Sequence, residues 1–375
     1  MSGVLVSAGE ASGDLYASEL VRALAARHPG VPFYGCPGHH MEAAGVEPII
    51  HASSLGVVGL VEVVRHIPRI YGEFRKLIAG ARRRRPDVAI LTDSPDFNLR
   101  VAAEMKKLGV PVIYLIAPQV WAWRQKRVRR FPGLIDELLC IFPFEEKWFR
   151  DRGVNATYIG HPLTHIVRTT RSREDFFSHH GLNPARQLVT LLPGSRIGEM
   201  ERHLPAVVDA ARRLKDVQCV LATPPGFAAR AGAAFFRERI SGSSIQVVEG
   251  ETSDALAHAD VALAASGTVT VEAAVLGTPM VTFYRVSPLS WALGRRLVKV
   301  PFLTMVNLIA GRRVVPEIMQ DEVTGERLAA ETQALLVNPL KREEMKRELA
   351  LVTDALRTPE HPMVRAAAIA GKYIP

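Results

Sequence analysis

The sequence is poor in cysteine, with three in 375 residues: Cys36, Cys140 and Cys219. No two of them form a Cys-x-x-Cys pair, which excludes a thiolate zinc site and a disulfide framework and predicts buried thiols in a reducing compartment. Long apolar runs are also absent, since none approaches the ~20 residues of a membrane-spanning helix. Because the first residues lead directly into an apolar strand, we expect no signal peptide.

Acidic residues are outnumbered by basic ones, 38 to 47, which gives a net charge of +9. This balance favours a polyanionic partner: nucleic acid, an anionic membrane surface or a phosphorylated substrate. No helix-turn-helix, zinc-finger or RNA-recognition signature is present, so nucleic acid is not expected. The hydrophobic content of 48% and charged content of 23% exclude a disordered chain.

The length predicts two domains, and short apolar strands alternating with amphipathic helices predict an α/β fold in both. The alternation stops at 160–184, which holds charges and prolines, and resumes with a strand at 188–192. We therefore expect domains over residues 1–165 and 166–345, followed by a helical segment over 346–375.

The second domain has a strand at 261–264, the turn Ser266-Gly267-Thr268 and an alanine-rich helix. Such a turn leaves backbone N–H groups unpaired at the positive end of the helix dipole, which attracts phosphate. Glu272, one turn into the helix, is suited to accept hydrogen bonds from ribose hydroxyls. The alternative is an ordinary strand-turn-helix with an acidic first turn.

Other polar positions of this domain are candidates for the same ligand. Ser195 and Arg196 follow the strand at 188–192, and the planar guanidinium can hold two diphosphate oxygens. Asn307 lies in a late polar segment that continues through a loop at 315–320.

In the first domain, the turn at 7–14 lacks Gly-x-Gly-x-x-Gly spacing, which rejects a dinucleotide fingerprint. Its Glu10, Ser12 and Asp14 suit sugar hydroxyls better than phosphate. After the strand at 112–116 comes a possible platform for an apolar or sugar group: Gln119, Trp121 and Trp123.

Two acids, Asp93 and Asp96, follow a strand expected at 87–92. Chemistry in open α/β sheets collects at the carboxyl ends of strands, and Pro95 restricts the loop between them. Either acid is alternatively a cap of the helix that begins near Asn98.

The stretch 57–67 would be apolar nearly all round as a helix, which is unusual at a surface. Pro68 is expected to start a second helix, which ends in four arginines at 82–85. Apolar surface beside a basic cluster is typical of an interfacial membrane-binding segment; the alternative is a buried helix. The residues expected at the membrane are Val57, Val58, Leu60, Val61, Val64 and Ile67.

Five motifs occur in order: AGEASGD at 8–14, DSPDFN at 93–98, PQVWAWR at 118–124, LPGSR at 192–196 and SGTVTVE at 266–272. In this combination the chain resembles the lipid A disaccharide synthases, inverting glycosyltransferases of Gram-negative outer-membrane biogenesis. The resemblance implies the GT-B architecture: two Rossmann-like domains facing a cleft, with the nucleotide on the C-terminal domain. It implies transfer of diacylglucosamine from UDP-2,3-diacylglucosamine to 2,3-diacylglucosamine 1-phosphate, forming a β-1,6 disaccharide and UDP.

The resemblance also implies no metal or cofactor, peripheral attachment to the cytoplasmic face of the inner membrane, and a dimer that exchanges C-terminal segments. Displacing UDP needs a base for the acceptor hydroxyl, for which we expect Asp96, with Asp93 as the alternative base or the group that holds the loop. Arg196 and the turn at 266–268 would stabilise the diphosphate in place of a metal. The acceptor would contact Glu10, Ser12, Asp14, Asn98, Gln119, Trp121 and Trp123.

The chain departs from the family pattern at two places. Ala117 stands where the family has Ser, and CPGHH at 36–40 replaces a Gly-Gly-Pro-type loop. Histidines, including His161, His165 and the doublets at 39–40 and 179–180, are expected to be structural or solvated.

Two other functions remain open. A UDP-sugar 2-epimerase of the same architecture would need neither an acyl-binding patch nor a second sugar. A non-catalytic nucleotide-binding membrane protein would show no turnover.

Overall fold

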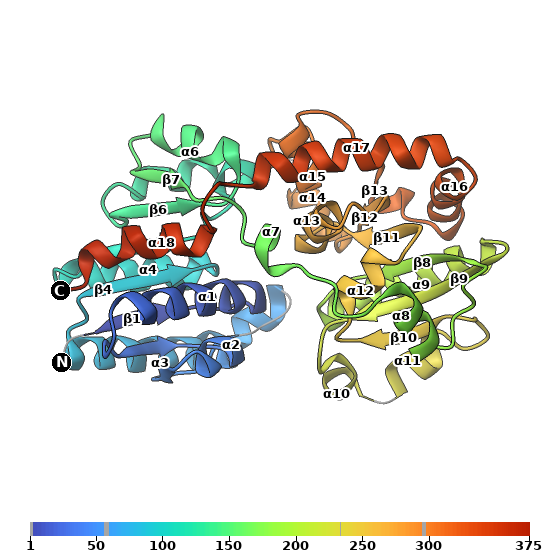
Figure 1. Ribbon diagram of the computed structural model, residues 1–375. Coiled ribbons are helices and arrows are strands. Elements are labelled where there is room, and N and C mark those ends of the chain that lie inside the picture. The colour runs from blue at the N-terminus through green and yellow to red at the C-terminus, as the bar shows by residue number, and fades with distance from the viewer. Residues whose placement is uncertain (1–2, 56–59, 233, 295–297) are drawn as a thin grey trace. The chain divides into compact units, whose positions relative to one another are not determined.

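The computed structural model describes residues 3–55, 60–232, 234–294 and 298–375 (Figure 1). The chain forms two compact units: unit 1 comprises Met1–Pro162 with Leu356–Pro375, and unit 2 comprises Leu163–Ala355. The chain thus passes between the units twice. Two α/β units built on parallel sheets confirm the predicted fold class.

Unit 1 is built on a seven-stranded sheet in the order β3-β2-β1-β4-β5-β6-β7. All neighbouring strands are parallel, and most of their residues are buried because helices cover both faces of such a sheet, while Glu47 and Pro48 of the edge strand β3 are exposed. The strands are β1 (Val4–Ser7), β2 (Phe33–Cys36), β3 (Val46–Pro48), β4 (Val88–Thr92), β5 (Val112–Leu115), β6 (Glu137–Cys140) and β7 (Ala156–Tyr158).

The helices of unit 1 alternate with these strands, except that the last one comes from the C-terminus and packs against α1 (Figure 1). They are α1 (Ala11–Arg27), α2 (His39–Ala43), α3 (Leu60–Arg84), α4 (Pro95–Lys107), α5 (Val120–Trp123), α6 (Pro143–Arg150) and α18 (Pro362–Ala370), with 3-10 turns at Ala52–Ser54, Gln125–Arg130 and Gly371–Tyr373.

Unit 2 repeats the architecture with a six-stranded parallel sheet in the order β10-β9-β8-β11-β12-β13. Its strands are β8 (Gln187–Leu192), β9 (Val217–Thr223), β10 (Gln246–Glu249), β11 (Val261–Ala265), β12 (Met280–Tyr284) and β13 (Glu317–Met319). Its helices are α7 (Leu163–Ile166), α8 (Arg173–His179), α9 (Ile197–Arg213), α10 (Phe227–Ala231), α11 (Ala234–Arg239), α12 (Thr252–Ala257), α13 (Thr268–Val275), α14 (Pro288–Gly294), α15 (Met305–Ala310), α16 (Gly325–Leu336) and α17 (Pro339–Leu356), with a 3-10 turn at Gln320–Glu322.

Four expectations differ from the structure. The turn expected at 7–14 ends earlier, since α1 already begins at Ala11 and contains Gly13 and Asp14. Pro68 does not start a helix but lies inside α3, since its φ is helical and the buried Leu77, Ile78 and Ala81 anchor the following turns. The expected boundary at 345/346 falls within α17, whose buried face belongs to unit 2 up to Ala355. The expected loop at 315–320 contains β13, because Ile318 pairs beside Phe283 in the core.

Among the described residues, no helix is both long and apolar enough to cross a membrane. Part of the expected membrane segment lies outside the described residues, namely Val57 and Val58. Leu60, Val61 and Val64 belong to α3. The side chain of Ile67 is exposed on that helix, together with Tyr71.

Candidate functional site

The first site residues lie where β1 and β4 end, side by side, in unit 1. The carboxylate of Asp93 accepts hydrogen bonds from the backbone N–H of Gly9 (2.7 Å) and Glu10 (3.1 Å). A Cβ atom at Gly9 would overlap Ser94, and one at Gly13 would overlap Asp93 Oδ2. The two glycines are therefore needed for the acidic loop to close on the Asp93 carboxylate.

The backbone at Asp93 is strained. Asp93 (φ 48°) and Ser94 (φ 36°) are consecutive left-handed residues other than glycine. Such strain persists only where the surroundings enforce it, and here Tyr114 donates a hydrogen bond to the Asp93 carbonyl (2.6 Å). The strain turns the chain sharply from β4 into α4 and places Asp93 against the β1 loop.

The charge state of Asp93 suits proton chemistry near neutral pH. Burial raises its pKa to about 7, and the nearby Glu10 charge adds to the rise, while the N–H donors of Gly9 and Glu10 oppose it. Both of its oxygens are nevertheless engaged with the loop backbone. The geometry favours a role in holding the loop.

Asp96, in the first turn of α4, has a different environment. Its side chain is 74% exposed, and Arg127 donates to its Oδ1 at 2.6 Å, with Arg124 3.9 Å from Oδ2. A ligand that enters from solvent can therefore contact this carboxylate if the hydrogen bond with Arg127 is released.

Several predicted acceptor residues have internal roles instead. Asp14 is buried and accepts from the backbone N–H groups of Gly38 (2.8 Å), His40 (2.8 Å) and Met41 (3.1 Å), so it caps α2. Asn98 is also buried, where it donates to the Thr92 carbonyl (2.7 Å) and locks the start of α4. These two predictions are corrected: the side chains build the loops and do not line a binding surface.

The predicted tryptophan platform divides in the same way. Trp121 is buried and donates from Nε1 to the carboxylate of Glu145 at 2.9 Å, so it belongs to the core. Trp123 is exposed, with the Arg124 guanidinium 4.2 Å from its ring centroid. Glu10 and Gln119 are also exposed and Ser12 is half-buried, so these remain acceptor candidates.

Burial raises the pKa of Glu145 to about 7, against the opposing donors Trp121, Phe142 and Ile141. The folded protein thus keeps a proton that the unfolded chain releases near pH 4.5, and stability from this group is lost as pH rises toward 7. In the wild type, this group should make the free energy of unfolding fall by about 1 kcal/mol per pH unit between pH 5 and 7. We expect Glu145→Gln to remove that contribution to the slope, as measured by urea unfolding at several pH values. Glu146→Gln is the matched control and should leave the slope unchanged; equal slopes in Glu145→Gln and the wild type would contradict the assignment.

In unit 2, the carboxyl ends of three neighbouring strands, β8, β11 and β12, carry the predicted nucleotide residues or adjoin them. Gly267 and Thr268 are exposed at the start of α13, and Ser266 donates to the Leu303 carbonyl at 3.2 Å. The turn thus presents backbone N–H groups at a helix start, as an anion site requires.

Glu272 is half-buried in α13 and accepts a hydrogen bond from the Ser253 hydroxyl at 2.7 Å. Burial raises its pKa above the ordinary value, with the Ser253 bond opposing the rise. One oxygen is thus fixed by α12, which orients the carboxyl group.

Arg196 is exposed at the N-cap of α9, and Nη1 lies 3.6 Å from Glu199 Oε1. The other Glu199 oxygen accepts from the backbone N–H of Ser195 (3.3 Å), while Tyr284 donates to Oε1 (2.9 Å). Glu199 is not among the residues predicted from sequence, although an acid three residues after a helix N-cap is a capping signal. It holds the loop that carries Arg196.

Asn307 is corrected from a nucleotide ligand to a structural residue. It is buried, with Oδ1 accepting from the N–H groups of Val314 (2.7 Å) and Val315 (2.9 Å). Its Nδ2 donates to the Val315 carbonyl and to Glu317 Oε1, both at 2.9 Å. The amide is fully used within unit 2.

A group of possible metal ligands in the described part of the chain is His179, His180 and Glu251, with ligand atoms within 4.8 Å of one another. Arg171 donates to Glu251 Oε2 at 3.1 Å, and His180 Nε2 is 3.2 Å from the same oxygen. The cluster ties α8 to the start of α12. His161 is buried, and burial lowers its pKa to about 3.

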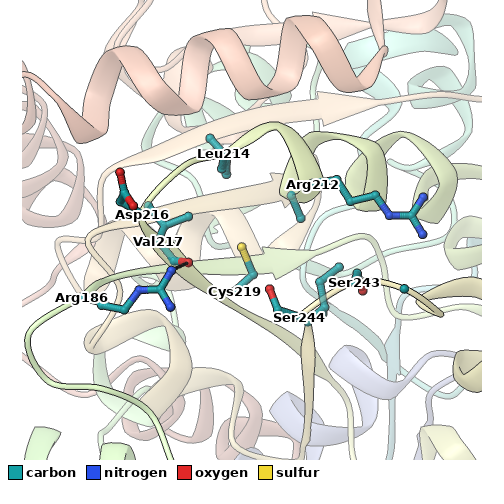
Figure 2. Close-up of a pocket in the computed structure, with 11 residues that line it drawn as sticks. Arg186, Arg212, Leu214, Asp216, Val217, Cys219, Ser243 and Ser244 are labelled. Atoms are coloured by element: carbon teal, nitrogen blue, oxygen red, sulfur yellow. Dashed lines mark hydrogen bonds between the residues drawn. The ribbon is translucent and has the colours of Figure 1, made fainter.

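A cavity of about 370 Å³ lies at the opposite edge of the unit 2 sheet (Figure 2). Arg186 precedes β8, Val217 begins β9 and Ile245 precedes β10, so these lining residues mark the amino ends of the strands. Arg186 and Arg212 both donate to backbone carbonyls there. The cavity is separate from the predicted site, which occupies the carboxyl ends.

Comparisons with known proteins cover nearly the whole chain. The profile of the lipid-A-disaccharide synthetase family matches residues 4–369. The lipid-A-disaccharide synthase of Solibacter usitatus is 58% identical over 356 residues, 95% of this chain and 93% of the relative. That of Myxococcus xanthus is 44% identical over 349 residues, 92% of this chain and 91% of the relative.

Solved structures show the same fold at low sequence identity. UDP-GlcNAc 2-epimerase from Neisseria meningitidis bound to UDP-GlcNAc aligns with a TM-score of 0.66 at 11% identity, covering 99% of each chain. MurG of Acinetobacter baumannii aligns with a TM-score of 0.58 at 13% identity, covering 99% of this chain and 100% of its own.

Proposed function

The chain belongs to the lipid-A-disaccharide synthetase family, and from this premise we propose which of its residues perform the transfer. It is a glycosyltransferase that moves 2,3-diacylglucosamine from its UDP derivative to 2,3-diacylglucosamine 1-phosphate, releasing UDP. The epimerase alternative is not favoured, because curated relatives up to 58% identical carry the disaccharide synthase name.

Asp96 is the general base in this proposal, and Asp93 holds the acidic loop that borders the acceptor. The observation that carries the assignment is the contrast in access: Asp96 is 74% exposed, whereas both Asp93 oxygens accept from the Gly9 and Glu10 backbone. A base must come within hydrogen-bond reach of the hydroxyl whose proton it takes, and Asp96 is free to do so on giving up an arginine contact.

Unit 2 binds the UDP-sugar in this proposal. Arg196, Ser195 and the turn at 266–268 surround the diphosphate, and the carboxyl group of Glu272 accepts from ribose. Negative charge grows on the diphosphate as the bond to the anomeric carbon breaks, so a guanidinium and backbone N–H groups lower the barrier there. No metal or other cofactor is required for these roles.

The test is an assay of UDP release from UDP-2,3-diacylglucosamine, with and without the lipid acceptor. UDP release that depends on the acceptor and yields a disaccharide supports the proposal. Conversion of the UDP-sugar to its 2-epimer in the absence of acceptor would contradict it. Activity should survive dialysis against EDTA within about twofold. A loss that Mg²⁺ or Zn²⁺ restores would refute metal independence.

Replacement of Glu272 tests the ribose contact. Loss of one hydrogen bond to a charged group costs about 1.5–3 kcal/mol, so Glu272→Ala should raise the KM for the UDP-sugar about tenfold or more. Ser253→Ala, which removes only the hydroxyl that orients Glu272, should raise it less. An unchanged KM in folded Glu272→Ala would remove this residue from the site.

Attachment to an anionic membrane surface belongs to the same proposal. Ile67 is 53% and Tyr71 56% exposed on α3, whose last turn carries Arg82, Arg83 and Arg84. Apolar side chains beside basic ones favour the interface between lipid headgroups and acyl chains.

We expect the protein to sediment with vesicles that contain anionic lipid. The double variant Ile67→Ser/Tyr71→Ser should bind these vesicles about tenfold more weakly. Leu340→Ser is the control, since Leu340 is 81% exposed on α17 in the other unit. Equal sedimentation of the double variant and the control would contradict the role of α3.

A dimer that exchanges C-terminal segments is also part of the proposal. The support is the position of α18, which follows α17 of unit 2 and packs against α1 of unit 1. A second copy offers the same α1 surface. Light scattering of the purified protein tests this, and a monomeric mass at micromolar concentration would contradict it.

A further inference from the structure

His203 connects two loops at the carboxyl edge of the unit 2 sheet. It lies on α9, seven residues after Arg196, and its imidazole is fully buried. Nδ1 is 2.6 Å from the carbonyl oxygen of Pro193, in the loop after β8. Nε2 lies 3.0 Å from both the backbone N and the carbonyl oxygen of Arg285, just after β12.

These contacts define the state of the ring. The Pro193 carbonyl can only accept and is the nearer of the two carbonyls, at 2.6 Å against 3.0 Å for that of Arg285, so in the neutral ring Nδ1 carries the proton and donates it. Nε2 is then the acceptor that the Arg285 N–H needs. Burial lowers the pKa of His203, which keeps the ring neutral and this arrangement intact at neutral pH.

The ring is also held by packing. Phe283 contacts it edge-on with centroids 5.3 Å apart, and Tyr284 contacts it at 5.2 Å. A second link joins the same elements, since Tyr284 donates to Glu199 of α9. Rotation of the imidazole would leave a buried carbonyl and a buried N–H without partners, so the connection is rigid.

The two loops that His203 joins each carry a guanidinium. Arg196 lies at the end of the first loop and Arg285 at the start of the second. Within the part of the chain that the structure describes, the Arg285 guanidinium makes no hydrogen bond or ion pair. Arg285 follows β12, and so adjoins the turn after β11, the strand next to β12 in the sheet.

We propose that His203 is a positioning residue of the diphosphate site, which fixes the loops after β8 and β12 so that Arg196 and Arg285 act on one UDP diphosphate. This inference rests on the proposed function, because the site is assigned to UDP there. It adds Arg285 as a second cationic ligand and gives the reason for a buried histidine in α9.

The test compares UDP with uridine, which lacks the diphosphate, by titration calorimetry on the full chain. His203→Phe keeps the aromatic packing and removes both hydrogen bonds, and we expect it to weaken UDP binding about tenfold or more and uridine binding less than about twofold. His203→Asn restores a donor near Nδ1 and should recover part of the UDP affinity. Arg285→Gln should also lose UDP affinity selectively.

Val207→Ala is the matched control, because Val207 is fully buried one turn further along α9. It should lower the Tm and leave the ratio of UDP to uridine affinity unchanged. An unchanged ratio in folded His203→Phe would overturn the inference. If that variant does not fold, His203→Asn and Arg285→Gln decide, and unchanged UDP affinity in both overturns it.

The same data separate the inference from its premise. A wild type that binds no UDP would overturn the proposed function and the inference together. A wild type that binds UDP, and loses it in Arg196→Ala but not in the His203 and Arg285 variants, would overturn the inference alone.

Discussion

Asp96→Asn is expected to lower kcat by about 10²–10⁴-fold, which is the usual contribution of general-base catalysis. The primary hydroxyl of a sugar is a poor nucleophile at neutral pH, so its proton must leave as the new bond forms. The amide keeps the shape of the carboxylate and can still contact Arg127, whose guanidinium is 2.6 Å from Asp96 Oδ1, but it cannot take a proton. The affinity for the UDP-sugar should stay within about twofold, because that substrate is bound by unit 2.

Asp93→Asn is the informative comparison. It retains an acceptor for the Gly9 or Glu10 N–H and should lose less activity than Asp96→Asn. A larger loss in Asp93→Asn, with nearly full turnover in folded Asp96→Asn, would move the base to Asp93, where the pKa of about 7 is already suitable.

Gly13→Ala is expected to have the second largest effect. The new methyl group would overlap the carboxylate of Asp93 and force it away from the Gly9 and Glu10 N–H groups. Overpacking of this kind costs about 1–3 kcal/mol of stability. Activity should fall by about tenfold or more, since the strained β4 turn that carries Asp93 also starts the helix with Asp96.

Gly72→Ala is the matched control, because Gly72 also lies in a helix but a Cβ there meets nothing within 4 Å. It should be neutral or slightly stabilising, as alanine is the better helix former. Thermal unfolding and kcat of the two variants are the measurements. Similar values for both would mean that the segment at 8–14, which includes the first turn of α1, does not hold Asp93.

Regular elements followed from sequence where one physical signal dominates. Apolar runs at 87–92 and 261–264 predict buried parallel strands, since both faces of such strands are covered, and the structure has β4 at Val88–Thr92 and β11 at Val261–Ala265. The signal failed at Pro68, because a proline predicts a local break, whereas burial of distant side chains decides whether the helix continues.

The site residues could be located by sequence at the carboxyl ends of strands, but their roles could not be separated there. Glu10 and Asp14 are four residues apart at the start of α1, yet Asp14 caps α2 from within the core and Glu10 is exposed. Trp121 and Trp123 are two residues apart, and one donates to buried Glu145 while the other faces solvent. Both lie in α5, where residues two positions apart point to nearly opposite sides of the helix, and composition does not reveal which side is buried.

The sequence by itself determined the α/β class and, through five ordered motifs, the family resemblance, because strand periodicity and loop chemistry are local properties of the chain. Only the tertiary structure decided that Asp93 is hydrogen-bonded to the backbone after β1, that Asn307 is hydrogen-bonded to residues nearby in its own unit and that His203 joins two loops. The contacts of Asp93 and His203 join residues far apart in the chain: Gly9 and Asp93 are 84 positions apart, and His203 and Arg285 are 82. Burial and partner geometry, which set both pKa and access, exist only once the sheets have formed.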